Sequence, residues 1–237
     1  MTQLAAQTAL VTGANRGLGR EFVRQLLERG VTKVYAAARD PKSIDVTDLR
    51  VVPLQLDVTD PDSVARAAEL ADDVSVIVNN AGILAAASVV GHDTSQLRRE
   101  LEVNLFGPLA VTSAFADGVS ERSGVVVNVA SVLSWLALGG SYSVSKAALW
   151  SATDSMRIQL GPRGVQVVGV YMGYVDTDMA AGVEAAKTSP ADVVRQVLDG
   201  IESGASEILA DDLARDVRAS LNQPVGARYA PFLPEAV

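Results

Sequence analysis

The sequence predicts an α/β fold in which helices pack around a parallel sheet, and two observations support this prediction. Short runs rich in Val, Ile and Leu alternate with longer segments of helical period, the pattern of repeated βαβ units. A glycine-rich turn also follows the first apolar run directly. The expected strands are residues 8–11, 33–38, 51–56, 74–78, 125–130, 165–171 and 206–210.

Composition limits the classes of function. The 237 residues suit one domain, 49% of them are apolar, and no repeat or linker divides the chain. The formal charge of −8 argues against nucleic acid or anionic membranes as partners. There is no cysteine, and the single histidine, His92, interpreted as a loop residue, cannot form a multi-histidine site, so no metal is expected.

The chain carries no recognisable targeting or spanning segment. The N-terminus lacks a basic and then apolar signal, and the most apolar stretch, residues 125–138, is too short for a membrane span. We therefore expect a cytoplasmic, soluble protein.

The first strand leads into a turn that suits a pyrophosphate. Gly13, Gly17 and Gly19 allow a sharp turn and a close approach of the backbone, and a helix with apolar residues on one face follows. The spacing is G-x-x-x-G-x-G, not the commoner G-x-G-x-x-G, and a plain tight turn is the alternative. The turn also contains Asn15, Arg16 and Leu18.

The second strand ends at Arg39, twenty residues after Gly19, where the choice of cofactor is expected to be made. An NAD site needs an acidic residue here to hold the ribose hydroxyls, whereas an arginine accommodates the 2′-phosphate of NADP. Arg16 offers a second guanidinium. Asp40, an acidic residue, could favour NAD instead, and both arginines could be solvated surface residues. NADP is the favoured cofactor.

Polar or small residues follow the next two strands. Asp57 and Val58 end the third strand, where Asp57 either meets the adenine edge or forms a turn, and Asp60 with Pro61 begins a helix. The fourth strand leads to a small, polar segment at the point where the chain would cross the cofactor, made of Asn79, Asn80, Ala81 and Gly82.

A long helix is expected over residues 95–115, with Pro108 inside it. Proline lacks an N–H and presses on the carbonyl four residues earlier, which here belongs to Asn104. That carbonyl should be free to bind a water, and a simple kink is the alternative. Ser131 then ends the fifth strand, where ligands bind in open α/β sheets.

The segment 131–141 is apolar and carries Leu133 and Trp135, so it forms either a pocket wall or a buried contact. Tyr142 and Lys146 follow, one helical turn apart on one face. A phenol normally loses its proton near pH ~10, and a neighbouring ammonium lowers the pKa of the phenol, which gives an acid/base group for an alcohol oxygen. Further helices are expected over 189–201 and 211–221, and residues 222–237 as an extended tail.

These motifs together resemble the short-chain dehydrogenase/reductase family over residues 6–212, in its compact, NADP-preferring branch. The resemblance rests on Thr12-Gly13-x-x-x-Gly17-x-Gly19, Asn79-Asn80-Ala81-Gly82, Asn104, Ser131 and Tyr142-x-x-x-Lys146. It implies a seven-stranded, doubly wound Rossmann-type sheet, a single catalytic domain over residues 1–237, and a nicotinamide cofactor across its carboxyl edge.

The resemblance also implies roles for single residues. Tyr142 would be the general acid/base, Ser131 would bind the substrate oxygen, Lys146 would hold the nicotinamide ribose, and Asn104 would position a water. Cofactor contacts are expected from Gly13, Asn15, Arg16, Gly17, Leu18, Gly19, Arg39, Asp57, Val58, Asn80, Ala81, Gly82, Tyr142, Lys146, Gly173, Val175 and Thr177. Substrate contacts are expected from Leu133, Trp135 and Tyr174.

Two features depart from the family pattern. Met172, not proline, precedes Gly173, so the cofactor contacts of Val175 and Thr177 lose a stiff support. The segments between Ser131 and Tyr142 and between residues 177 and 189 are short, from which we expect an open site.

The expected reaction is the reversible, NADPH-dependent reduction of a hydrophobic ketone or aldehyde to an alcohol, in a homodimer or homotetramer. One alternative is a catalytically silent NADP-binding sensor or scaffold protein, which would not need the Ser/Tyr/Lys/Asn set. Another is an NAD-dependent epimerase or dehydratase, although such relatives carry a larger C-terminal domain and would retain their nucleotide through dialysis.

Overall fold

A computed structural model describes residues 3–232, and its centre is one seven-stranded parallel sheet in the order β3-β2-β1-β4-β5-β6-β7. The fold predicted from the sequence is confirmed, with strand ends within two residues of those expected. The strands are β1 (Thr8–Thr12), β2 (Lys33–Ala38), β3 (Val51–Gln55), β4 (Val76–Asn79), β5 (Val125–Val129), β6 (Gln166–Tyr171) and β7 (Glu207–Leu209).

The strand order reverses at β1, which pairs with β2 on one side and β4 on the other. Val11 lies beside Ala36 of β2 and beside Val78 of β4. In open α/β sheets such a reversal leaves a crevice at the carboxyl ends of the strands, where ligands bind. The segments that follow β1, β4, β5 and β6 meet at this crevice.

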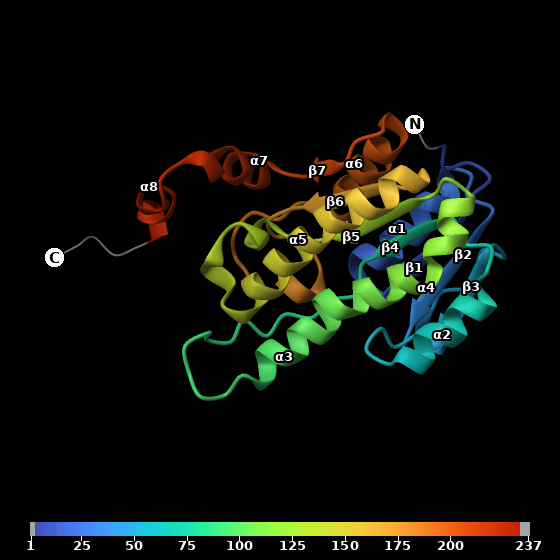
Figure 1. The fold of residues 1–237 in the computed structure, drawn as a ribbon, viewed down its shortest axis with the longest axis horizontal. Coiled ribbons are helices and arrows are strands. Elements are labelled where there is room, and N and C mark those ends of the chain that lie inside the picture. The colour runs from blue at the N-terminus through green and yellow to red at the C-terminus, as the bar shows by residue number, and fades with distance from the viewer. Residues whose placement is uncertain (1–2, 233–237) are drawn as a thin grey trace.

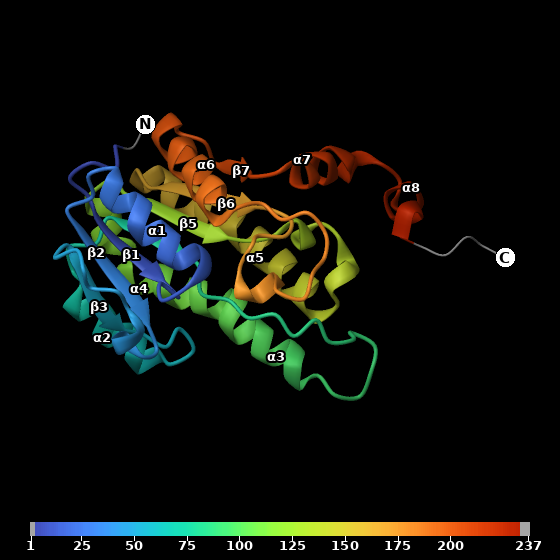
Figure 2. The same ribbon diagram turned by 180° about the vertical axis from the view of Figure 1, so that it is seen from behind.

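Helices cover both faces of the sheet (Figures 1 and 2). One face carries α1 (Gly17–Glu28) and α6 (Pro190–Ser203), and the other carries α2 (Pro61–Leu70), α4 (Gly107–Glu121) and α5 (Ser141–Leu160). Each layer has its own apolar core: Phe22 and Ile201 are fully buried on the first face, Val111 and Met156 are buried on the second. Each Å² of buried apolar surface contributes about 25 cal/mol, and this burial stabilises both layers.

The long helix predicted over residues 95–115 is interrupted. It begins as α3 (Ser95–Leu101), widens to a π-helical segment (Glu102–Phe106), and continues as α4. Gly107 N–H bonds to the Glu102 carbonyl, five residues back, and Pro108 has no N–H to restore the α pattern. The wide turn contains Asn104, whose side chain is fully buried.

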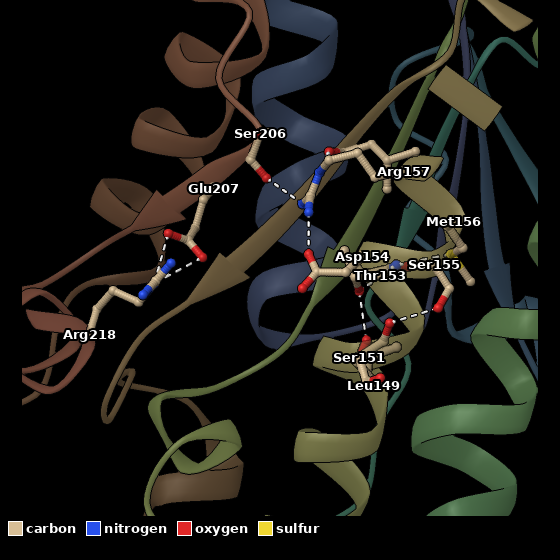
Figure 3. A network of polar contacts seen from close by, with 12 residues as sticks. Leu149, Ser151, Thr153, Asp154, Ser155, Met156, Arg157, Ser206, Glu207 and Arg218 are labelled. Carbon is tan, nitrogen blue, oxygen red and sulfur yellow. Dashed lines mark hydrogen bonds and ion pairs between the residues drawn. The ribbon is translucent and has the colours of Figure 1, made fainter. Parts of the chain in front are cut away.

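Polar contacts anchor the far end of α5 to the sheet (Figure 3). Arg157 pairs with Asp154 on its own helix and donates to the Ser206 carbonyl at 2.9 Å, just before β7. Beside it, Arg218 pairs with Glu207 at 3.0 Å. The Arg157 contact holds the C-terminal end of α5 against the segment before β7.

The C-terminal segment is more helical than the sequence predicts. After α7 (Asp212–Ala219), a 3₁₀ turn (Ser220–Asn222) leads to α8 (Val225–Tyr229), which projects from the body in Figures 1 and 2, and to a further turn (Ala230–Phe232). The prediction of an extended tail is therefore wrong for residues 222–232, and residues 233–237 lie outside the described residues. Tyr229 ties α8 to the body, because its hydroxyl accepts from the Ala137 N–H at 3.0 Å.

The remaining 3₁₀ turns are short and connect the main elements. They are Pro41–Ser43, Val132–Ser134, Ala137–Gly139, Gly161–Arg163 and Asp178–Ala180. Within residues 3–232, none of the helices combines the length and the apolar character that crossing a bilayer requires.

Candidate active site

The glycine turn after β1 is packed more tightly than any side chain would allow. Gly13 and Gly17 have φ values of +64° and +53°, the left-handed region that favours glycine. A Cβ on Gly19 would lie 2.1 Å from the Gly13 carbonyl oxygen. The turn and the start of α1 are thus in direct contact, as a pyrophosphate-binding turn requires.

The N-terminus of α1 is open to an anion. Arg16 occupies the cap position with extended backbone and makes no side-chain capping bond, so the first N–H groups of α1 lack that partner. Thr177 lies opposite, since a Cβ on Gly17 would be 3.2 Å from its methyl group. These features fit the pyrophosphate of a dinucleotide, with Thr177 on the far wall.

The end of β2 fits the adenosine half of the cofactor. Arg39 is exposed and close enough to Asp57 that its charge helps to lower the pKa of that carboxyl, after the larger effect of the Thr59 hydrogen bonds. Asp40 points elsewhere: its carboxylate accepts from the Lys42 N–H at 3.0 Å and caps a 3₁₀ turn. The guanidinium of Arg39 is therefore exposed at this position, whereas the Asp40 carboxylate caps the turn that follows.

Three residues that were predicted to contact the cofactor contact the protein itself. Asn80 Nδ2 donates to the carbonyls of Thr12 at 2.9 Å and Gly13 at 3.2 Å, so the side chain clamps the glycine turn. Asp57 Oδ1 accepts from the N–H and hydroxyl of Thr59, so the turn alternative raised by the sequence is realised. Val58 packs against Gly107, where a Cβ would come within 2.8 Å of it.

Asn104 joins the π-helical segment to the strand-β4 edge and to α5. Its Oδ1 accepts from the Ile83 N–H, and its Nδ2 donates to the Ile83 carbonyl and to the Ser145 hydroxyl, all at 2.9 Å. A Cβ on Gly82 would lie 3.3 Å from Asn104 Oδ1 and 3.8 Å from Lys146 Nζ. The structure therefore brings Gly82, Asn104 and Lys146 together.

Tyr142 and Ser131 also meet, at the start of α5 and the end of β5. Both are buried, with 7% of each residue exposed. The pKa of Tyr142 lies above its ordinary value: burial is the main cause, the charge of Glu100 adds to it, and a hydrogen bond with Ser131 opposes it. The lowered pKa predicted from the Tyr/Lys spacing is not found, because burial raises the pKa of Tyr142.

Lys146 lies one turn along, with Nζ 5.6 Å from the centre of the Tyr142 ring. The ammonium donates to the Val129 carbonyl at 2.8 Å, and burial lowers the pKa of Lys146 to about 8. A cation held this close to Gly82 and Tyr142 can bind ribose hydroxyls and stabilise a phenolate when the phenol gives up its proton.

A cleft of about 330 Å³ is lined by Gly82, the residue that lies next to Asn104 and Lys146. Arg16 pairs with Asp178 at 3.2 Å across it, both side chains being more than 70% exposed, and this pair links the glycine turn to the segment after β6. Arg16 is thus placed at the cleft in this structure, and an exposed pair of this kind is weak enough to exchange partners. The lining residues are Arg16, Gly82, Ile83, Leu84, Ala85, Gln96, Arg99, Asp178 and Met179.

The three residues predicted to contact the substrate differ in how far they are buried. Trp135 is 5% exposed and stacks on Tyr171 with ring centres 4.3 Å apart, so it belongs to a buried aromatic cluster and not to a substrate wall. Leu133 is half-buried against that cluster. Tyr174 is 45% exposed beside Gly173, whose N–H is held by Asp211 at 2.6 Å.

Sequence reasoning missed three acidic residues at this edge of the sheet: Glu100, Asp178 and Asp211. Asp211 both caps α7 and holds Gly173, which replaces the stiffness that a proline would give. Glu100 could have been found by its spacing, because it precedes Asn104 by one helical turn, as Tyr142 precedes Lys146.

Comparisons with known proteins agree with this geometry. A family model described as short chain dehydrogenase matches residues 7–188. A solved short-chain dehydrogenase from Burkholderia cenocepacia in complex with NADP is 38% identical, with a TM-score of 0.93 over 98% of this chain and 100% of that one. The NADPH-bound carbonyl reductase from chicken fatty liver is 27% identical, with a TM-score of 0.74 over 82% of this chain and 90% of that one.

A curated relative also has a described activity. The NADPH-dependent 1-acyldihydroxyacetone phosphate reductase of Schizosaccharomyces pombe is 31% identical over 182 residues, 73% of this chain and 61% of that protein. The chain spans between 61% and 64% of the length of several curated relatives that it matches.

Proposed function

The chain belongs to the short-chain dehydrogenase/reductase family of oxidoreductases, and from that premise we propose that it reduces a ketone or aldehyde to an alcohol with NADPH, reversibly. The observation that supports the proposal is that Tyr142 lies with Ser131 and Lys146, and that Lys146 and Asn104 both lie next to Gly82, which lines the cleft. When bound, NADPH supplies the hydride. Everything else in the reaction is the work of the protein.

The protein's part is to move one proton and to stabilise one oxygen. The Tyr142 hydroxyl donates its proton to the carbonyl oxygen as that oxygen gains negative charge, and the Ser131 hydroxyl donates a second hydrogen bond to it. Lys146 stabilises the phenolate that remains, and the raised pKa of Tyr142 keeps the phenol protonated before the reaction. Asn104 holds the backbone of Ile83, a residue that lines the cleft.

The same residues fit an NADP-type cofactor. The glycine turn and the uncapped α1 N-terminus would hold the pyrophosphate, Thr177 and Val175 the carboxamide end, and Arg39 the 2′-phosphate. The complexes of the two solved relatives with NADP and NADPH support this assignment.

Substituting Arg39 with Asp should reverse the preference between cofactors. The 2′-phosphate would lose its cation and meet a carboxylate, whereas a ribose with both hydroxyls would gain an acceptor. We expect binding titrations to show that wild type favours NADPH over NADH, and that Arg39→Asp weakens NADPH binding by about 100-fold, equal to ~2.7 kcal/mol. Lys42→Asp, also exposed and three residues away, is the matched control and should change the preference little. A wild-type preference for NADH would overturn the assignment.

The reaction itself is tested by loss of NADPH absorbance with a panel of small and bulky ketones and aldehydes. We expect turnover of carbonyl compounds with an apolar body, because Ile83, Leu84 and Met179 line the cleft. Arg99 and Gln96, which also line the cleft, would bind a polar end of the substrate. Cofactor binding without turnover of any carbonyl compound would favour a sensor or scaffold protein instead.

We further propose that the protein acts as a homodimer or homotetramer. Apolar side chains remain exposed on the two long helices beside the site, which supports a contact between copies there. These residues are Phe106, Leu109, Val144 and Ile158.

A further inference from the structure

We propose that Glu100 is a positioning residue for Tyr142: it holds the turn at residues 85–87 against the first turn of α5, the helix that carries Tyr142. This inference rests on the proposed function, because it assigns Tyr142 the role of proton donor.

Glu100 is a carboxylate in an unusual environment. It lies on α3 with none of its surface exposed. Its Oε1 accepts from the N–H of Ala85 at 2.6 Å and of Ala86 at 3.2 Å. Its Oε2 is buried and has no hydrogen-bond partner among the described residues. Burying a carboxyl group with only one of its oxygens bonded opposes folding, so a fold that keeps it points to a use outside stability.

The turn that Glu100 holds is strained. Ala86 has a φ of +50°, a conformation that costs a residue with a Cβ about 1 kcal/mol or more. Two charge-assisted bonds from one carboxylate oxygen are the type of contact that can maintain it. Glu100 therefore maintains the strained turn. Asn104, four residues later, holds Ile83 in the same segment.

The next residue of the turn connects to the catalytic helix. Ala87 N–H donates to the Ser141 hydroxyl at 2.9 Å, and the Ser141 N–H donates to the Ala87 carbonyl at 2.8 Å. Gly140 fits under this carbonyl only because it has no side chain, since a Cβ there would lie 2.2 Å from it. Ser141 directly precedes Tyr142, so the chain of contacts runs from Glu100 through the turn to the residue next to the phenol.

The charge of Glu100 acts on the same phenol. Three groups act on Tyr142: the charge of Glu100 from α3, Lys146 from its own helix, and the Ser131 hydroxyl from the end of β5. The Glu100 charge raises the pKa of Tyr142, since a negative charge disfavours the phenolate. Glu100 thereby extends into alkaline pH the range over which Tyr142 can donate a proton to a carbonyl oxygen.

Two substitutions separate the charge from the geometry. Glu100→Gln keeps an acceptor oxygen for Ala85 and Ala86 but removes the charge, whereas Ser141→Ala keeps the charge but breaks one bond of the clamp. The matched control is Glu102→Gln, which removes an exposed carboxylate two residues later, at the start of the π-helical segment.

Each variant is measured in two ways. The first is the pH profile of kcat/KM for NADPH-dependent reduction. The second needs no substrate: tyrosinate absorbance is titrated in each variant and in the same variant carrying Tyr142→Phe, and the difference gives the titration of Tyr142 alone.

We expect Glu100→Gln to move the alkaline limb of the profile and the tyrosinate midpoint down by on the order of one pH unit. Glu102→Gln should move neither. Ser141→Ala should lower kcat several-fold without moving the midpoint, and this variant tests the positioning role even where Glu100→Gln folds poorly.

An unmoved tyrosinate midpoint in folded Glu100→Gln would overturn the charge effect, and an unchanged kcat in Ser141→Ala would overturn the positioning. If no carbonyl compound is reduced, the proposed function fails, yet the absorbance titration still decides whether Glu100 acts on Tyr142.

Discussion

Tyr142→Phe is expected to abolish carbonyl reduction while leaving the protein folded and able to bind its cofactor. The hydroxyl is the only part removed, and in the proposed reaction it is the source of the proton. General acid catalysis contributes about 10²–10⁴-fold to a rate, so we expect kcat to fall by at least about 10³-fold. The ring still fills its buried position beside Lys146, so NADPH binding should stay within a few-fold of wild type.

The matched control is Tyr171→Phe. Tyr171 is also a buried tyrosine whose pKa is raised mainly by burial, but it stacks on Trp135 and its hydroxyl points back along β6 toward Gly169. Removing that hydroxyl should leave kcat close to wild type. Steady-state kinetics with NADPH and one carbonyl substrate, together with a fluorescence titration of cofactor binding, measure both variants. Retained turnover in Tyr142→Phe would exclude Tyr142 as the proton donor.

The sheet could be predicted from the sequence because each buried strand is a short apolar run between turn residues. Residues 33–38 are one such run, and the observed β2 has these same bounds. The long helix was harder, since Leu97 and Leu101 continue the helical period up to the π-helical segment. Pro108 predicts a disturbance of the helix, but a wider turn and a simple kink both accommodate a residue that has no N–H.

The proposed catalytic residues could be found from their spacing, whereas their surroundings could not. Tyr142 and Lys146 are only four residues apart, so one helix places them on the same face. The burial that raises the pKa of Tyr142 comes from elements far along the chain, and so does the Glu100 charge. Trp135 illustrates the same limit, because an apolar loop residue can face a ligand or pack on a distant strand, and only the position of Tyr171 decides between them.

Gly19→Ala should cause the second large loss, in cofactor binding. Two effects of the added methyl oppose each other. In a helix, Ala is favoured over Gly by about 1 kcal/mol, and Gly19 lies within α1, so propensity alone predicts a more stable protein. Packing predicts the reverse, because the Cβ would lie 2.1 Å from the Gly13 carbonyl oxygen and 2.6 Å from Asn80 Nδ2.

The clash should win, since the nearest atom belongs to the backbone and cannot rotate away. Either the glycine turn or the start of α1 must move, at a cost of about 1–3 kcal/mol. Both elements are the proposed pyrophosphate site, and a displacement of about 1 Å there is enough for a loss on the order of 100-fold in function. We therefore expect a lower thermal midpoint and NADPH binding weakened by about 100-fold, measured by differential scanning fluorimetry and by titration.

Gly161→Ala isolates the backbone effect of the same substitution. Gly161 ends α5 with a helical φ of −55°, and a Cβ there would meet no atom within 4 Å. This variant should keep wild-type cofactor affinity and gain up to about 1 kcal/mol of stability through the unfolded state. If Gly19→Ala behaved like Gly161→Ala, the glycine turn could not be the tightly packed phosphate site that the proposed function requires, because the turn would then have room for a side chain.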